Sequence, residues 1–255
     1  MNTLRRWNIT VGNLFFHYRN ALFPVTIGIT VVLLRPRILF DDPSLDHLLA
    51  SCGAAIALLG QGVRLLTIGY DYIERGGRAG QVYASHLVHG GVYALTRNPM
   101  YIGNTLIVIG VVMVSGAPAA YWLIAWFLFV YQSIIAAEEA YLRQRFGRDY
   151  DEYCALVPRF LPKIERLPQA LSRDRYQWRA ALRKELSTMA GLFTGLSLLP
   201  LWRTYFLDGM AAAQRAAMRH VLLALGILLT YGFLVYLKKH RRFFYLPAEL
   251  TGATE

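Results

Sequence analysis

Long apolar runs alternate with charged segments along this chain, and the runs define its predicted elements. The longest stretch without Asp, Glu, Lys or Arg covers forty residues, from Asn98 to Ala137. A membrane-spanning helix needs roughly 20 apolar residues, so this stretch has the length of two spans. Gly116, Ala117 and Pro118 lie near its middle. The pattern therefore predicts two antiparallel helices joined by a tight turn.

Further apolar runs flank this hairpin. The expected spans are about 22–34, 48–68, 100–116, 118–136, 185–203 and 220–238. The first is short and reaches full length only if Arg35 and Arg37 extend toward the membrane interface while residues 38–40 continue the helix. The second contains Gln61 and Arg64. The predicted fold is an all-α, polytopic membrane bundle of about six transmembrane helices.

Composition agrees with a membrane protein. Of the 255 residues, 55% are hydrophobic and only 17% are charged, whereas soluble domains carry about 25% charged residues. The mean hydropathy is +0.33. The two cysteines, Cys52 and Cys154, allow no disulfide framework or zinc spacing, and no metal-ligand cluster stands out. The N-terminal segment does not have the pattern of a removable signal peptide.

The formal net charge of +11 sets the expected orientation. If the N-terminus is cytoplasmic, twenty-one Lys and Arg residues lie on the cytoplasmic side and five on the other. The positive-inside rule then places both termini in the cytoplasm, in a bacterial-type inner membrane or an internal membrane. Because the basic residues flank apolar spans, the expected partner is the lipid bilayer rather than nucleic acid. No obligatory protein partner is inferred.

Residues 166–184 form a separate predicted element. Leu167, Leu171, Trp178 and Leu182 recur at helical spacing with arginines on the other faces, which favours an interfacial amphipathic helix over a solvated one. The expected organisation is an N-terminal segment with the first span (1–47), a core with the hairpin (48–165), and the amphipathic helix with two C-terminal spans (166–255).

Two polar segments bracket the hairpin, residues 86–104 and 136–162. Both are expected on the cytoplasmic side, where they can form a pocket for a charged cofactor. A sulfonium methyl donor requires alignment of nucleophile, carbon and sulfur. Carboxylates can bind its ammonium or ribose, an arginine its carboxylate, and tyrosine faces its cation. The suitable residues are Tyr93, Arg97, Tyr101, Glu138 and Glu139.

An ordered series of motifs accompanies these residues. It consists of His86-Leu87-Val88, Gly91-Val92-Tyr93, Arg97-Asn98-Pro99-Met100-Tyr101-Ile102-Gly103, Glu138-Glu139, Phe146-Gly147, Tyr150, Tyr153 and Val157-Pro158. Over about residues 48–162 the chain resembles the isoprenylcysteine carboxyl methyltransferase and phospholipid methyltransferase superfamily of membrane enzymes. Each motif is weak alone, but their order around a charge-free hairpin is specific.

The resemblance implies an S-adenosylmethionine-dependent methyltransferase whose acceptor arrives laterally from the bilayer. The implied cofactor-binding residues are His86, Leu87, Gly91, Tyr93, Arg97, Asn98, Pro99, Tyr101, Glu138 and Glu139. Arg97, Tyr101 and Glu139 are the implied catalytic residues, and Arg64, Arg143 and Arg159 are weaker candidates on the acceptor side. Asn98 stands where carboxyl methyltransferases usually have histidine. The acceptor can therefore be a prenylcysteine-like carboxylate, a phospholipid amine or a thiol.

Simpler interpretations exist for the same residues. Taken alone, Arg97 can be a positive-inside anchor and Glu138-Glu139 a solvated helix end, while Arg64 fits both a snorkelling side chain and a pocket residue. Two other functions remain open: a sterol-type membrane reductase using NADPH, and a non-catalytic transporter or scaffold. The Glu-Glu pair favours the methyl donor, and intramembrane charge is too sparse to indicate an ion pathway.

Overall fold

The computed structural model describes residues 3–70, 82–172 and 176–240 of the chain. Every regular element in these ranges is helical, in agreement with the predicted all-α class. The α-helices are α1 (Thr3–Leu33), α2 (Pro43–Tyr70), α3 (Pro99–Ser115), α4 (Trp122–Phe146), α5 (Arg148–Leu156), α6 (Leu167–Ser172), α7 (Trp178–Asp208) and α8 (Met210–His240). Short 3-10 turns lie between them: η1 (Leu39–Asp41), η2 (Gly91–Ala94), η3 (Pro118–Tyr121) and η4 (Ile164–Arg166).

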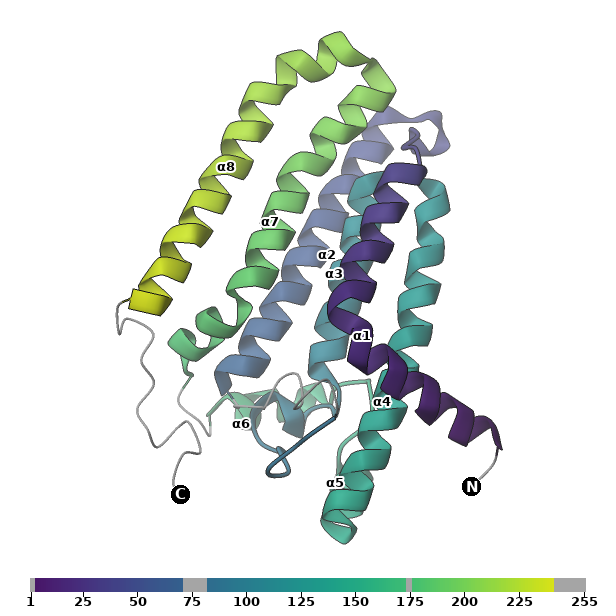
Figure 1. Cartoon of the computed structure of the whole chain (residues 1–255), viewed down its shortest axis with the longest axis vertical. Helices are drawn as coiled ribbons and strands as arrows, with labels where there is room; N and C mark the ends of the chain where they lie inside the picture. The colour runs from purple at the N-terminus through teal and green to yellow at the C-terminus, as the bar shows by residue number, and fades with distance from the viewer. Residues whose placement is uncertain (1–2, 71–81, 173–175, 241–255) are drawn as a thin grey trace.

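Six long helices, α1 to α4, α7 and α8, run up and down the bundle (Figure 1). The start of α1 and the end of α8 lie at one end, together with α5, α6 and the segment that leads into α3. We call this the proximal end. The distal end carries the turns between α1 and α2, between α3 and α4, and between α7 and α8. This is the alternation that an even number of spans requires.

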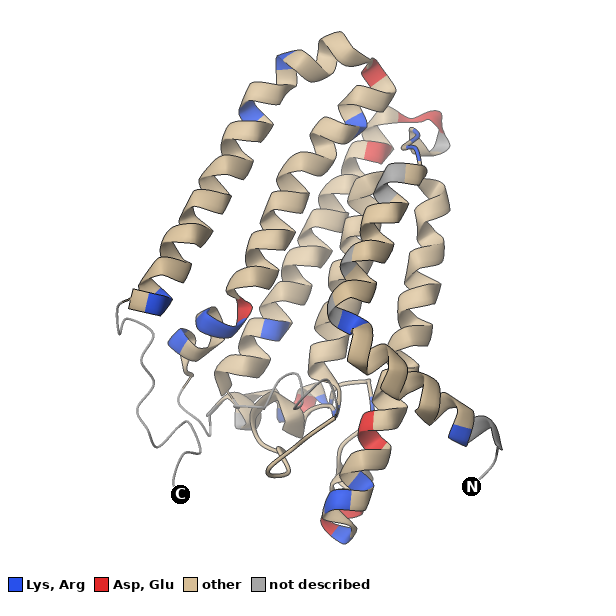
Figure 2. Ribbon diagram, viewed as in Figure 1, with Lys and Arg blue, Asp and Glu red and all other residues tan. Residues whose placement is uncertain are grey.

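The bundle is that of an integral membrane protein. By length and composition, three helical units could each cross a membrane: α2, the η3–α4 unit (Pro118–Phe146) and α8. Helix α3 is also apolar but has only 17 residues. Figure 2 shows charged residues gathered mainly toward the two ends of the long helices, with few in between. The six predicted spans thus correspond to six long helices. Three of these are both long enough and apolar enough to cross a membrane.

The predicted hairpin is formed by α3 and α4. Pro99 occupies the first turn of α3, where the absence of its N–H costs nothing. Gly116 ends the helix in the left-handed conformation, with φ of 60°, and its N–H donates to the Met113 carbonyl at 3.2 Å. Pro118 then opens η3. Helix α4 continues ten residues beyond the predicted boundary at 136, so Glu138 and Glu139 lie inside it.

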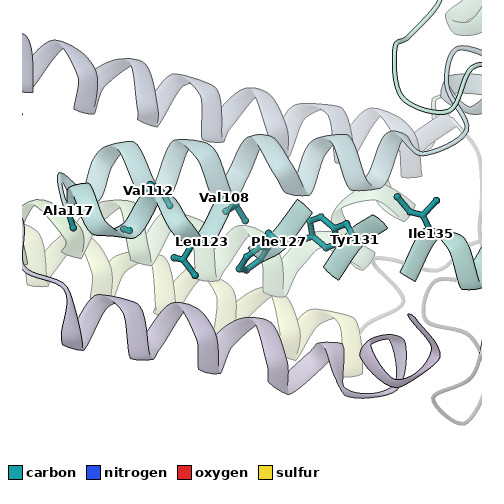
Figure 3. Close-up of a cluster of buried hydrophobic side chains, with 8 residues drawn as sticks. Val108, Val112, Ala117, Leu123, Phe127, Tyr131 and Ile135 are labelled. Atoms are coloured by element: carbon teal, nitrogen blue, oxygen red, sulfur yellow. The ribbon is translucent and has the colours of Figure 1, made fainter. Parts of the chain in front are cut away.

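The core of the hairpin is a cluster of buried apolar residues from α3, the turn and α4 (Figure 3). Its members are Val108, Val112, Ala117, Ala120, Leu123, Phe127, Tyr131 and Ile135. Helix α1 packs on the same cluster, because the Phe23 ring stacks on Phe127 with centroids 4.9 Å apart. This packing holds α1 against α4.

Helices α2 and α3 approach closely through glycines. A Cβ added to Gly60 would lie 2.5 Å from the Gly103 carbonyl oxygen, and one added to Gly110 would lie 2.3 Å from the Gly53 carbonyl oxygen. Small residues at such interfaces let helix backbones pack closely in a membrane. The contact fixes the position of α3, whose first turn carries Asn98-Pro99.

Two predicted elements were wrong. Helix α1 gains its length at the N-terminal side, from Thr3, and ends at Leu33, so residues 38–40 do not continue it. The segment 166–184 is not one amphipathic helix. It comprises the end of η4, the short α6 and the first residues of α7, with Tyr176 and Gln177 outside any helix. Residues 173–175 of that segment lie outside the described residues.

Candidate active site

A cavity of about 570 Å³ opens at the proximal end, a volume typical of sites for small ligands and cofactors. We call it the proximal cavity. The two polar segments that flank the hairpin in sequence meet here. Nine of the thirteen implied site residues line it: Arg64, His86, Leu87, Tyr93, Arg97, Asn98, Tyr101, Glu138 and Glu139.

The two adjacent carboxylates on α4 have different partners. The Tyr101 hydroxyl donates to Glu138 Oε1 at 2.9 Å. The Glu139 carboxylate accepts from Arg159 Nε at 2.9 Å, and Arg97 Nη1 lies 3.6 Å from the same Glu139 oxygen. Arg97 and the carboxylate pair therefore belong to one site, rather than to opposite faces of the bilayer.

The backbone of Arg97 is held by a hydrogen bond, whereas its guanidinium group has a buried nitrogen without a hydrogen-bond partner among the described residues. Its N–H donates to the Pro158 carbonyl at 2.9 Å. Nη1 donates to Cys154 Sγ at 2.6 Å. The Nε atom is buried and has no hydrogen-bond partner among the described residues. A buried guanidinium nitrogen without a partner is costly, so this N–H is suited to bind an acidic group of a ligand.

The residues beside Arg97 attach the loop that leads into α3, residues 95–98, to residues 158–163. Thr96 Oγ1 donates to the carbonyl of Arg159 at 3.2 Å, and Asn98 Nδ2 donates to the same carbonyl at 3.0 Å. The Lys163 N–H donates to the Leu95 carbonyl at 3.0 Å. Positions 96 and 98 thus bond to one backbone segment, while Arg97 between them faces the cavity.

Two tyrosines of α5, Tyr150 and Tyr153, also line the cavity. The Tyr153 hydroxyl donates to the Tyr93 carbonyl at 2.8 Å. Tyr150 is buried, and burial together with the nearby Glu139 carboxylate raises the pKa of its phenol well above the ordinary value. Tyr150 therefore stays protonated over the physiological range and contributes a neutral hydroxyl to the cavity lining.

Arg64 lines the cavity and forms an ion pair between α2 and α7. Its Nε and Nη2 donate to the two Glu185 oxygens, each at 2.8 Å, and Gln61 Nε2 donates to Glu185 at 2.9 Å. Nη1 donates to Asn104. Arg64 therefore does not snorkel: it is paired, and it lines the cavity as well.

Four of the implied site residues do not line the cavity. Gly91 is buried with φ of 48°, a conformation that favours glycine, and Pro99 starts α3. Arg143 pairs with Asp151 at 2.7 Å on the exposed side of α4. Arg159 contacts two lining residues, because its Nε donates to Glu139 and its carbonyl accepts from Asn98. Gly91, Pro99 and Arg159 therefore support the cavity from behind its surface.

Several residues that line the cavity were not predicted from the sequence. Phe16, Arg19 and Phe23 come from α1, and Lys184 comes from α7. The Arg19 guanidinium carbon lies 3.7 Å from the centroid of the Phe16 ring, a cation–π contact. Helical spacing puts these three α1 residues on one face, but only the packing of α1 on α4 shows that this face meets the cavity.

Comparisons with known proteins find similar sequences over part of this chain. The family model for phospholipid methyltransferases matches residues 50–149. A rice protein (Oryza sativa subsp. indica) named "probable protein-S-isoprenylcysteine O-methyltransferase" is 30% identical over 141 residues, 52% of this chain and 71% of that protein. The protein-S-isoprenylcysteine O-methyltransferase of Schizosaccharomyces pombe is 36% identical over 81 residues, 31% of this chain and 34% of that protein. No solved structure matches the chain.

Proposed function

Because the chain belongs to the superfamily of phospholipid methyltransferases and isoprenylcysteine carboxyl methyltransferases, we propose that it methylates a lipid-like acceptor with S-adenosylmethionine. Membership makes it a membrane methyltransferase; the donor and the acceptor are the proposal. The observation that carries it is the meeting of Arg97, Tyr101, Glu138 and Glu139 in one cavity of about 570 Å³.

The lining fits the polar groups of S-adenosylmethionine. When bound, this donor supplies a methyl group on a cationic sulfur. The unpartnered Arg97 Nε would bind its carboxylate. The Glu138 and Glu139 carboxylates would accept from its ammonium and ribose hydroxyls, and the aromatic faces of Tyr93 and Tyr101 tolerate the positive charge.

The remaining wall suits an apolar acceptor. Phe16 and Phe23 of α1 line the cavity together with Ile134 of α4, and the three belong to one apolar cluster. Leu142 of α4 also lines the cavity, where it packs against the cluster of Tyr150 and Tyr153. Helix α1 also exposes large apolar side chains, such as Val25 and Ile29, to its surroundings. An acyl or prenyl chain from the bilayer would therefore lie along α1 while its head group enters the cavity.

A carboxylate is the acceptor group that we propose first. Arg19 lines the cavity beside the apolar wall and would bind an anionic head group. A carboxylate is already a nucleophile, so transfer needs alignment rather than a general base. The curated relatives are named for methylating S-isoprenylcysteine.

A phospholipid amine is the second candidate, favoured by the family model and by Asn98 in place of histidine. An amine must lose a proton, which a cavity carboxylate such as Glu138 could accept. The Asn98 side chain, however, donates to the Arg159 carbonyl. Its amide holds the loop, which weakens the inference from Asn98 to the acceptor.

We place the proximal cavity on the cytoplasmic side. Most of the 27 Lys and Arg residues flank segments that reach the proximal end, and the positive-inside rule assigns such an end to the cytoplasm. A soluble donor made in the cytoplasm would then enter directly. Reaction of introduced cysteines with a membrane-impermeant reagent in sealed vesicles measures this orientation.

The acceptor is tested with purified protein in detergent and S-adenosylmethionine labelled in its methyl group. Farnesylcysteine analogues, phosphatidylethanolamine and an apolar thiol are offered separately. We expect the labelled methyl group to appear in the farnesylcysteine analogue. Base should release it as methanol, because methyl esters are base-labile and methylamines are not. The Glu139→Ala variant should lose this incorporation, and the exposed Arg148→Ala variant should keep it. Base-stable label in phosphatidylethanolamine would show that the acceptor is an amine. Absence of S-adenosylmethionine binding would refute the proposal.

A further inference from the structure

A second cavity, of about 420 Å³, lies between α7 and α8 near the proximal end. We call it the α7–α8 cavity. Four of the residues that line it are basic: Arg183 and Lys184 from α7, and Lys238 and Lys239 from α8. The described residues that line it include no Asp or Glu. Figure 2 shows the corresponding basic ends of α7 and α8 facing each other.

The basic residues are arranged on facing helix surfaces. Tyr231, Val235, Lys238 and Lys239 are spaced by four, three and one residues, which puts them on one face of α8. Lys238 Nζ donates to the Arg183 carbonyl at 3.3 Å, so this ammonium reaches the first turns of α7. Four positive groups around one space repel one another, and an anion between them would relieve that repulsion.

The cavity also has apolar lining. Leu186 of α7 and Val235 of α8 line it on the distal side of the four basic residues, which form its rim. Helix α8 offers further apolar surface, because only 6% of an apolar stretch of 18 residues in it is buried in the bundle. Leu228 and Leu229, for example, are exposed on α8. A ligand with an anionic head and long acyl chains matches both parts, whereas a small soluble anion matches only the rim.

We propose that the α7–α8 cavity binds the phosphate of an anionic phospholipid, with the acyl chains lying along α8. Basic pockets between membrane helices are known to bind anionic head groups. The site is outside residues 50–149, which match the methyltransferase family model, and it is independent of the donor and acceptor proposed above. Lys184 lines both cavities, so a test of this site should leave Lys184 intact and measure lipid binding rather than methyl transfer.

The test compares two double variants of the full-length protein in neutral detergent. Lys238→Gln with Lys239→Gln removes two charges from the rim. Arg215→Gln with Arg219→Gln removes the same charge from the same helix toward the distal end, and serves as the matched control. Binding of phosphatidylglycerol, phosphatidylcholine and inorganic phosphate is titrated by native mass spectrometry.

We expect the wild type and the arginine control to bind phosphatidylglycerol in preference to phosphatidylcholine. The lysine variant should bind phosphatidylglycerol about 30-fold more weakly, because each basic residue contributes roughly a fivefold gain in affinity for an anionic lipid. Equal phosphatidylglycerol binding by both variants would overturn the proposal. Saturable binding of inorganic phosphate with no preference for phosphatidylglycerol would overturn its lipid part.

Discussion

The buried pair Arg64–Glu185 allows a sharp test of how α7 is joined to the core. We consider Glu185→Gln, which keeps the side-chain volume and removes the charge. In the structure Glu185 is 0% exposed and accepts from Arg64 twice at 2.8 Å and from Gln61 at 2.9 Å. Glutamine can retain one of these acceptors, but it leaves the Arg64 guanidinium without a countercharge.

Burial sets the expected magnitude. Removing one partner of a buried ion pair costs about 3–5 kcal/mol, because the remaining charge stays desolvated. Arg148 and Glu152 provide the matched control: their N–O distance is also 2.8 Å, but their side chains are 89% and 61% exposed. An exposed pair at i, i+4 contributes only about 0.3–0.5 kcal/mol. Glu152→Gln should therefore cost roughly a tenth as much as Glu185→Gln.

The assay is unfolding of the detergent-solubilised protein by sodium dodecyl sulfate, followed by far-UV circular dichroism. Stability is the appropriate readout because Arg64 also lines the proximal cavity. The double variant Arg64→Met with Glu185→Leu should recover most of the loss, since two apolar side chains leave no unpaired charge. If the double variant is as unstable as Glu185→Gln, or if Glu152→Gln costs as much, burial of the pair is not what determines its energetics.

Three further predictions address the packing and the site. Gly60→Leu should destabilise the fold by about 1–3 kcal/mol in the same unfolding assay, because its Cβ would lie 2.5 Å from a backbone oxygen of α3. Gly62→Leu, with nothing within 4 Å of its Cβ, should be tolerated in that assay. Arg97→Ala should weaken S-adenosylmethionine binding by roughly 10- to 100-fold in calorimetry while Arg148→Ala leaves it unchanged. Tyr153→Phe, which loses the 2.8 Å bond to a loop carbonyl, should lower stability by about 1 kcal/mol without abolishing donor binding.

The hairpin and the polar segments beside it were predictable from local pattern alone. A charge-free stretch of forty residues with Gly116 and Pro118 near its middle has few alternatives to two antiparallel helices. Antiparallel helices bring the residues before the first and after the second to the same end. The topology therefore brings Arg97 and Glu139 to the same end of the bundle, where their side chains lie 3.6 Å apart.

Contacts between distant parts of the chain were not predictable in this way. Glu185 lies 121 residues after Arg64, and in the sequence it only marks the start of the expected span 185–203. A buried and a snorkelling arginine have the same sequence pattern, so only the packing of α7 on α2 distinguishes them. Arg19 is similar, because its position beside the cavity depends on how α1 crosses α4.

The two C-terminal helices stand in different relations to the core. Helix α7 is tied to α2 near both ends, by Arg64–Glu185 proximally and by Arg203–Asp46 distally, and Arg203 Nη1 also donates to the Val114 carbonyl of α3 at 3.2 Å. Buried charges placed at two levels fix the register of α7 along the core, because a shift by one turn would leave both pairs broken. Helix α8 packs mainly on α7 and remains largely exposed. None of the described α8 residues lines the proximal cavity, whereas Lys184 of α7 does. Removing α8 should therefore expose one face of α7 but leave donor binding, measured by calorimetry, unchanged, whereas losing the α7 pairs should weaken it.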